Sequence, residues 1–153
     1  MHVCFVCTGN ICRSPMAASV FGAHLDRAGL ADQVRVTSAG TDGWHVGDTA
    51  DPRAAKTLAN HGYPTEHTAE QVGTGHLDAD LLVALDRGHD RALRRLVADP
   101  DRVRLLRSFD PDADDHDVPD PYYGGRQGFT DVLGMIEAAM PGLLDWVRGR
   151  LAA

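Results

Sequence analysis

The chain has 153 residues, of which 43% are hydrophobic and 24% are charged, an ordinary composition for a globular protein. This length predicts one domain over residues 1–153, with a core that needs neither disulfides nor a metal ion. The formal net charge of −7 argues against nucleic acid, which requires a basic surface on its partner.

Signals for membranes and for secretion are missing from the sequence. No apolar run reaches the roughly 18 residues of a membrane-spanning helix, and the chain does not begin with a cationic and then apolar signal. The cysteines Cys4, Cys7 and Cys12 form an odd, clustered set, which is typical of reactive thiols in a reducing compartment. We expect a cytoplasmic monomer that binds no membrane, and export without a signal peptide stays open.

The first stretch with a clear pattern is residues 3–15. Val3 to Val6 is apolar and rich in β-branched residues, which predicts a strand. Gly9 and Asn10 tolerate unusual backbone angles and predict a turn. We expect a helix to follow, with Ser14 as its N-cap and Pro15 at its first position.

The chemistry of this stretch follows from its shape. A turn that leads into a helix directs several backbone N–H groups at one point, which suits an anion and favours the thiolate of Cys7. Arg13 can then hold two oxygens of a phosphate as a planar fork. The alternative is a structural cysteine with Arg13 on the surface. It is the weaker interpretation, because the Cys-x5-Arg-Ser spacing matches one mechanism.

The remaining elements alternate between strand and helix patterns. Pro141 should bend or interrupt the last helix. The pattern predicts a three-layer α/β sandwich with a four-stranded parallel β-sheet, helices on both faces, and the phosphate-binding loop after the first strand. The expected elements after the loop are helices over 16–28, 52–60, 87–98 and 128–149, a short helix within 65–78, and strands over 34–38, 80–86 and 103–106.

Metal binding is disfavoured by the positions of the acidic and histidine residues. Asp110, Asp112 and Asp114 alternate as in a calcium loop, but Asp115 stands where that loop needs glycine, and Pro121 where it needs glutamate. The eight histidines show no ligand spacing with each other or with the cysteines. We expect no metal and no cofactor.

Two motifs together identify a family. The stretch Val6 to Pro15, with Asp120-Pro121-Tyr122-Tyr123-Gly124 near the other end, resembles the low-molecular-weight protein tyrosine phosphatases. The resemblance implies hydrolysis of phosphotyrosine in proteins or peptides, with inorganic phosphate as product. It assigns Cys7 as the nucleophile that forms a phosphocysteine, Arg13 as the phosphate clamp and Asp120 as general acid and base. The phosphate-binding loop comprises Thr8, Gly9, Asn10, Ile11, Cys12 and Ser14.

Several side chains have more than one interpretation. Trp44 either covers the edge of the core or, as the resemblance implies, lines the substrate cleft. Tyr122 and Tyr123 are not separated by the sequence, and each can pack, line the cleft or be phosphorylated. His67 is either an ordinary surface histidine or, as in the family, a hydrogen-bonding support of the loop. We expect Asn10 to fix the turn, Ser14 to stabilise the thiolate, Cys12 to be able to form a reversible disulfide with Cys7, and Cys4 to be a core residue.

Other functions on the same loop remain as alternatives. A thioredoxin-coupled arsenate reductase needs further cysteines, and none follows Cys12. Phosphoarginine phosphatases tend to carry Thr where this loop has Ile11, which fits an aromatic phosphoester better. A non-catalytic phosphotyrosine-binding module would lose the nucleophile or the acid. The chain departs from the family pattern at Ala18, where relatives often carry Glu, and at residues 125–128, which are less acidic than is common.

Overall fold

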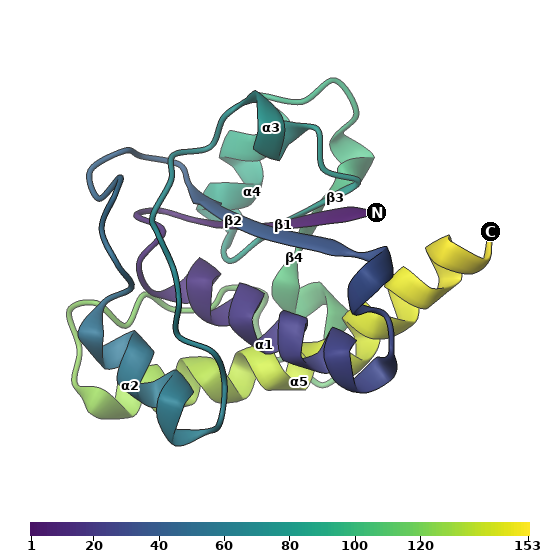
Figure 1. Ribbon diagram of the computed structural model, residues 1–153. Coiled ribbons are helices and arrows are strands. Elements are labelled where there is room, and N and C mark those ends of the chain that lie inside the picture. The colour runs from purple at the N-terminus through teal and green to yellow at the C-terminus, as the bar shows by residue number, and fades with distance from the viewer.

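The computed structural model describes residues 1–153 and has one four-stranded sheet at its centre (Figure 1). The strands are β1 (His2–Cys7), β2 (Arg35–Gly40), β3 (Leu81–Ala84) and β4 (Val103–Leu105). Their order is β2-β1-β3-β4, and every neighbouring pair is parallel. The chain changes direction across the sheet at β1, so the loop after β1 lies at the position where open α/β sheets bind ligands.

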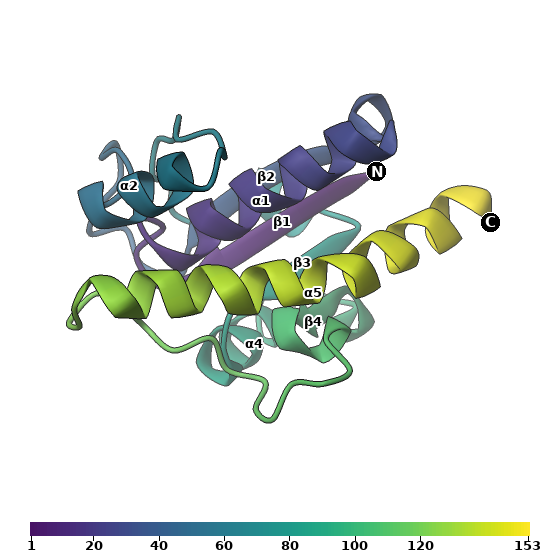
Figure 2. The same cartoon turned by 90° about the horizontal axis from the view of Figure 1, so that it is seen from below.

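Helices cover both faces of this sheet, which confirms the predicted three-layer sandwich. α1 (Arg13–Ala28), α2 (Pro52–Asn60) and α5 (Arg126–Ala152) lie on one side, and α3 (Thr74–Leu77) and α4 (Arg87–Arg94) lie on the other (Figures 1 and 2). Alternate residues of β1 face the two layers. Val3 and Phe5 join the large core under α1 and α5, whereas Cys4 and Val6 join the smaller core under α4.

Local sequence signals fix several boundaries as expected. Asp51 caps α2 by accepting a hydrogen bond from the Arg53 backbone N–H at 2.8 Å. All four residues of β3 are buried, as its continuous apolar sequence predicts. None of the helices combines the length and the apolar character that a bilayer crossing would need.

One expectation about helix ends is wrong. α1 begins at Arg13 and its cap position is Cys12, so Ser14 lies inside the first turn and is not the N-cap. Its hydroxyl is instead committed to contacts within the phosphate-binding loop. Of the two alternatives for Pro141, an interruption is excluded, because α5 is continuous from Arg126 to Ala152. A bend agrees with Figure 2, where the axis of α5 changes direction along its length. Pro141 is exposed, so the carbonyl group that loses its helical partner can be hydrated.

The close packing of α5 gives a prediction about stability. A Cβ atom at Gly142 would overlap the carbonyl oxygen of Phe109, at the end of the 3₁₀ helix η3 (Leu106–Phe109). Gly142→Ala should therefore lower the free energy of unfolding by about 1–3 kcal/mol in urea titrations. The matched control is Gly134→Ala on the same helix, where a Cβ meets nothing within 4 Å. Equal stabilities of the two variants would contradict the contact between α5 and η3.

Candidate functional site

A pocket of about 310 Å³ opens at the carboxyl end of β1 and brings together the two ends of the chain that carry the sequence motifs. Cys7 and Arg13 reach it from the loop, and Asp120 reaches it from the segment before α5. The complete lining is Cys7, Thr8, Gly9, Ile11, Cys12, Arg13, Asp42, Trp44, His45, Asp120, Tyr122 and Tyr123. Of these, Asp42 and His45 were not singled out by the sequence. His45 packs so closely on the loop that a Cβ at Gly9 would come within 3.0 Å of its ring.

The loop itself forms a cradle of hydrogen-bond donors. None of the backbone N–H groups from Thr8 to Cys12 donates a hydrogen bond within the protein. The segment then enters the N-terminus of α1, whose dipole adds partial positive charge. Successive free N–H groups at a helix start are the arrangement that binds phosphate.

Asn10 holds this loop in shape from behind. It is fully buried and has a φ of 57°, which a residue other than glycine rarely adopts. Its amide nitrogen donates to the hydroxyl oxygens of Ser14 at 2.7 Å and Ser38 at 3.0 Å. Its side-chain oxygen accepts from the Glu70 backbone N–H at 2.9 Å. Asn10 therefore fixes the turn, as predicted, and ties the loop to β2 and to residues 67–70.

His67 supports the same residue, so it is not an ordinary surface histidine. Its Nε2 lies 2.6 Å from the Asn10 carbonyl oxygen. Burial lowers the pKa of His67, which favours a neutral ring. A carbonyl oxygen only accepts hydrogen bonds, so Nε2 carries the proton and donates it.

The candidate nucleophile receives a hydrogen bond through Ser14. The Cys7 Sγ and Ser14 Oγ atoms are 2.9 Å apart, and both residues are buried. Since the Ser14 oxygen already accepts from Asn10, its own proton is free to point at the sulfur. A donor aimed at sulfur stabilises the thiolate.

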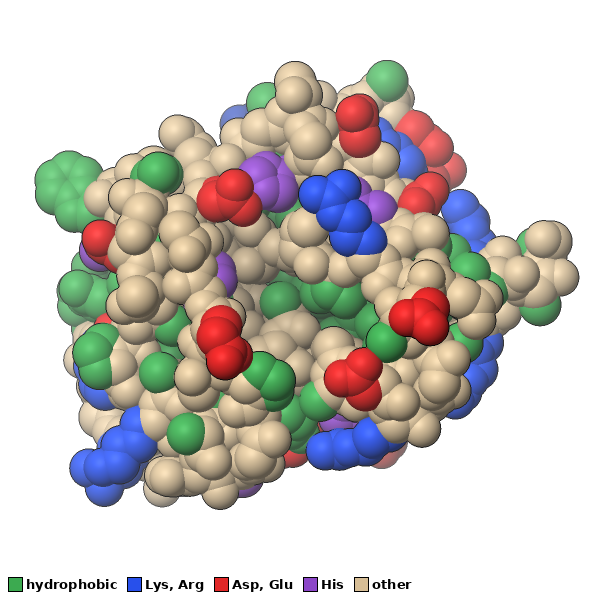
Figure 3. Space-filling model, in the orientation of Figure 1, with side chains coloured by type: hydrophobic (Ala, Val, Ile, Leu, Met, Phe, Trp, Pro, Cys, Tyr) green, Lys and Arg blue, Asp and Glu red, His purple; other side chains and the backbone are tan.

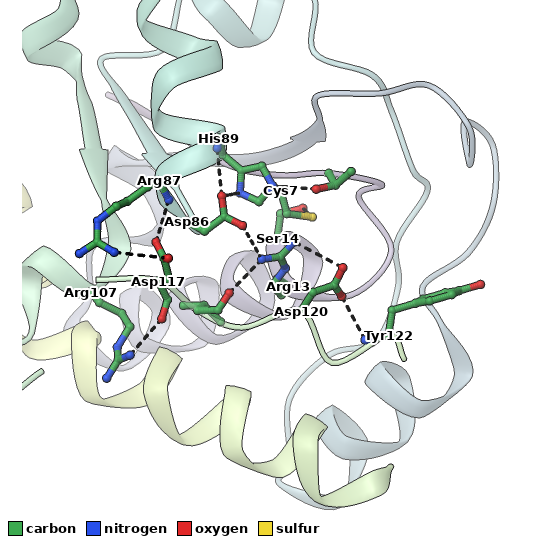
Figure 4. Close-up of polar contacts among 12 residues, drawn as sticks. Cys7, Arg13, Ser14, Asp86, Arg87, His89, Arg107, Asp117, Asp120 and Tyr122 are labelled. Atoms are coloured by element: carbon green, nitrogen blue, oxygen red, sulfur yellow. Dashed lines mark hydrogen bonds and ion pairs between the residues drawn. The ribbon is translucent and has the colours of Figure 1, made fainter. Parts of the chain in front are cut away.

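Arg13 is positioned by Asp86, which stands between β3 and α4, and by the segment around Val118 (Figure 4). It is 4% exposed, and its Nη1 donates to Asp86 Oδ2 and to the Val118 carbonyl oxygen, both at 2.9 Å. Nη2 lies 3.7 Å from Asp120 Oδ2. Sequence reasoning treated Asp86 only as the boundary of a buried strand. Its place at the carboxyl end of β3, beside β1 in a parallel sheet, is the signal that could have identified it.

His89 is a second group that the sequence did not single out. Its Nε2 lies 2.8 Å from the Thr8 hydroxyl, and its backbone N–H donates to Asp86 Oδ1 at 3.0 Å. Its Nδ1 is 3.2 Å from the same carboxylate oxygen but does not have hydrogen-bond geometry. Burial lowers the pKa of His89 to about 4, partly opposed by Asp86. The ring is therefore neutral near pH 7.

Asp120 lies at the rim of the pocket, close to Arg13. Its side chain is 44% exposed, and its Oδ1 accepts a hydrogen bond from the Tyr122 backbone N–H at 3.0 Å. The acidic residues that precede Asp120 form ion pairs away from the pocket. Asp115 and Asp117 pair with Arg87, and Asp114 pairs with Arg107. These ion pairs hold the acidic segment against α4 and η3 and leave Asp120 as its one member that lines the pocket.

Aromatic side chains rise around the opening. Trp44 is 86% exposed, so it does not cover the core. The structure separates the two tyrosines: Tyr123 is 90% exposed, whereas Tyr122 is 38% exposed and lies under the guanidinium of Arg53, 5.4 Å from its ring centroid. The two tyrosine rings meet edge to face at 5.0 Å.

The other two cysteines differ from Cys7 in their surroundings. Burial, with help from Asp51 and Cys7, raises the pKa of Cys12 to about 12, and burial raises that of Cys4 to about 11. Both are therefore thiols at neutral pH. Cys4 belongs to the small core under α4, as expected. Cys12 lines the pocket beside Cys7, and all three cysteines are free.

Known proteins with this arrangement share both sequence and fold. A family model described as low molecular weight phosphotyrosine protein phosphatase matches residues 2–152. The chain is 62% identical to the low molecular weight protein-tyrosine phosphatase A of Mycobacterium tuberculosis, over 99% of this chain and 94% of that one. It superimposes with a TM-score of 0.93 on a protein tyrosine phosphatase of Entamoeba histolytica, 30% identical, covering 97% of each chain.

A further solved relative is an arginine phosphatase. This is the YwlE protein of Bacillus subtilis, as a mutant with a phosphorylated active-site serine. Its TM-score is 0.86 and its identity 28%, covering 97% of this chain and 96% of that one.

The contact between Ser14 and Cys7 can be tested without a substrate. Ser14→Ala removes the donor to sulfur and should slow alkylation of Cys7 by iodoacetamide at pH 7 about tenfold, the loss expected for one hydrogen bond to a charged group. Mass spectrometry of peptides distinguishes Cys7 from Cys12 and Cys4. Ser19→Ala is the control, since that hydroxyl donates to the Pro64 carbonyl oxygen. An unchanged alkylation rate of Cys7 in Ser14→Ala would show that Ser14 does not stabilise the thiolate.

His89 should make the protein sensitive to acid. Its pKa is about 4 when folded and 6.5 as the ordinary value, so the unfolded chain binds more protons between these pH values. The free energy of unfolding should fall as pH drops from 6.5 to 4, with a contribution from His89 of at most about 3 kcal/mol. His89→Asn should flatten this slope in urea titrations, whereas His116→Asn, at an exposed site, should not. An identical slope in His89→Asn would contradict the assignment.

Proposed function

The chain belongs to the low molecular weight phosphotyrosine protein phosphatases, and on this premise we propose that Cys7, Arg13 and Asp120 carry out its reaction. The observation that carries the proposal is the shared pocket, where the thiol, the guanidinium, the carboxyl group and a loop of free N–H groups meet. Members of this family hydrolyse phosphotyrosine, and the chain is accordingly an enzyme of the phosphoric monoester hydrolase class.

In the first step, the Cys7 thiolate attacks phosphorus and forms the S–P bond while the bond from phosphorus to the tyrosyl oxygen breaks. Asp120, protonated at this point, gives its proton to that oxygen, so tyrosine leaves as the neutral phenol. The N–H groups of residues 8–12 and the guanidinium of Arg13 stabilise the charge on the non-bridging phosphate oxygens. These donors supply the electrostatic stabilisation that a metal ion provides in other phosphatases, so no cofactor enters the steps.

In the second step, water attacks the phosphocysteine and Asp120, now a carboxylate, takes its proton. The S–P bond breaks, inorganic phosphate is released and the Cys7 thiolate is restored. Ser14 supports the thiolate as leaving group through its 2.9 Å contact with sulfur. The YwlE relative, a C7S mutant with a phosphorylated active-site serine, supports a covalent phosphoenzyme intermediate.

Phosphotyrosine in a protein or peptide is the proposed substrate. Ile11, Trp44 and Tyr122 give the pocket an apolar and aromatic wall, which suits a phenyl ring. The YwlE relative is an arginine phosphatase, so phosphoarginine is the competing substrate on this fold. An arsenate reductase that passes a disulfide along the chain needs further cysteines, and none follows Cys12 in this sequence. A single catalytic domain over residues 1–153, a monomeric state and a cytoplasmic location complete the proposal.

The mechanism is tested by two variants on phosphotyrosine peptides. Cys7→Ser should abolish turnover, because a hydroxyl in this site is a far weaker nucleophile than a thiolate. Asp120→Asn should lower kcat about 10²–10⁴-fold, because it can no longer transfer a proton. Activity of the wild type should survive a metal chelator and exceed that on phosphoarginine peptides. Retained activity in Cys7→Ser, or a preference for phosphoarginine, would contradict the proposal.

A further inference from the structure

A second, smaller cavity of about 210 Å³ lies between α2 and the start of α5. Figures 1 and 2 both show α2 lying against the first turns of α5. On α2, the residues that line the cavity recur at helical spacing, so they share one face. Its charged lining consists of Arg53, Lys56 and Arg126, and it includes no acidic residue.

This local charge opposes that of the whole molecule. Three formal positive charges meet here on a chain whose net charge is −7. Acidic and basic side chains are interspersed on the face shown in Figure 3, with no continuous basic surface. Arg53 is neutralised by Asp51, which accepts from its Nε at 3.1 Å and its Nη2 at 3.0 Å. Lys56 and Arg126 take part in no ion pair, so the cavity keeps two uncompensated cations.

The start of α5 adds positive potential to the same place. Its cap residue, Gly125, has no side chain to accept a hydrogen bond, and the first turn contains no acidic residue. The backbone N–H groups of Arg126 and Gln127 have no acceptor in the protein. The N-terminus of a 27-residue helix therefore faces the cavity without a counter-charge.

One contact between side chains links the lining of the cavity to that of the catalytic pocket. Arg53 lines the cavity, and its guanidinium lies over the ring of Tyr122, which lines the catalytic pocket. An extended peptide advances about 3.3–3.6 Å per residue. A peptide bound by its phosphotyrosine can therefore extend past Tyr122 and Arg53 toward Lys56 and Arg126.

We propose that this cavity is an anion subsite for the substrate polypeptide. It binds the carboxylate of an aspartate or glutamate, or the phosphate of a second phosphotyrosine, a few residues from the phosphotyrosine that is hydrolysed. The inference rests on the proposed function and adds to it a class of substrate, namely acidic or doubly phosphorylated phosphotyrosine segments. Such binding selects among peptides and leaves the chemistry at Cys7 unchanged.

The test compares four substrates: a phosphotyrosine peptide with acidic neighbours, the same peptide with alanine neighbours, a doubly phosphorylated peptide, and p-nitrophenyl phosphate. The double variant Lys56→Ala/Arg126→Ala should lower kcat/KM for the acidic peptide about tenfold, which corresponds to just under 1 kcal/mol for each of two exposed charge contacts. It should not change kcat/KM for the alanine peptide or for p-nitrophenyl phosphate, because neither residue lines the catalytic pocket. The doubly phosphorylated peptide shows whether phosphate is preferred over carboxylate.

Two controls make the result specific. Arg95→Ala/Arg104→Ala removes the same charge from exposed positions after α4 and on β4, and should leave the preference for acidic peptides intact. Lys56→Glu/Arg126→Glu should reverse it in favour of lysine-flanked peptides, and higher salt should weaken it in the wild type. Equal losses on acidic and alanine peptides, or no preference in the wild type, would overturn the subsite. Failure to hydrolyse p-nitrophenyl phosphate would instead overturn the proposed function.

Discussion

The phosphate-binding loop depends on one buried side chain held in an unfavourable backbone conformation. A residue other than glycine at a φ of 57° costs about 1–3 kcal/mol, which the surroundings must offset. Asn10 meets this cost with hydrogen bonds to Ser14, Ser38 and Glu70 and with the bond that its carbonyl oxygen accepts from His67. Because the Asn10 amide fixes Ser14, it also fixes the donor to Cys7. The same residue, Asn10, therefore holds both the turn that exposes the N–H groups and the hydroxyl group that contacts Cys7.

On the side of the loop that faces α4, the carboxylate of Asp86 makes the main contacts. Asp86 caps α4 through the His89 backbone N–H and accepts from Arg13 with its other oxygen. One carboxylate therefore joins the start of a helix on one face of the sheet to a guanidinium at the start of a helix on the other. His89 adds a neutral contact to Thr8. The buried cation of Arg13 is balanced by this carboxylate and by the half-exposed Asp120, which leaves the loop amides free for substrate.

Local signals predicted most of the fold, and long-range contacts account for what they missed. The apolar run of β3 and the Asp-Pro start of α2 specify their own structures. The cysteine motif and Asp120, far apart in the sequence, line one pocket in the structure. Serine is a common N-cap residue, which is why Ser14 was predicted to cap the helix. Its hydroxyl group instead contacts Cys7 and Asn10, and the helix starts one residue earlier, at Arg13. The partners of Arg13 lie 73 and 105 residues away, at a distance where spacing in the sequence carries no information. Asp86 and His89 were missed for that reason, and the clustering of Lys56 with Arg126 is visible only once α2 and α5 are packed together.

The contact between Arg13 and the Val118 carbonyl oxygen has a consequence for the order of biosynthesis. A ribosome delivers Cys7 and the loop after β1 within the opening residues, and delivers Val118 and Asp120 more than a hundred residues later. A nascent chain therefore contains the loop sequence before it contains the groups that hold the Arg13 guanidinium. The Arg13 guanidinium can take its observed position only when the segment that contains Val118 has left the exit tunnel and docked.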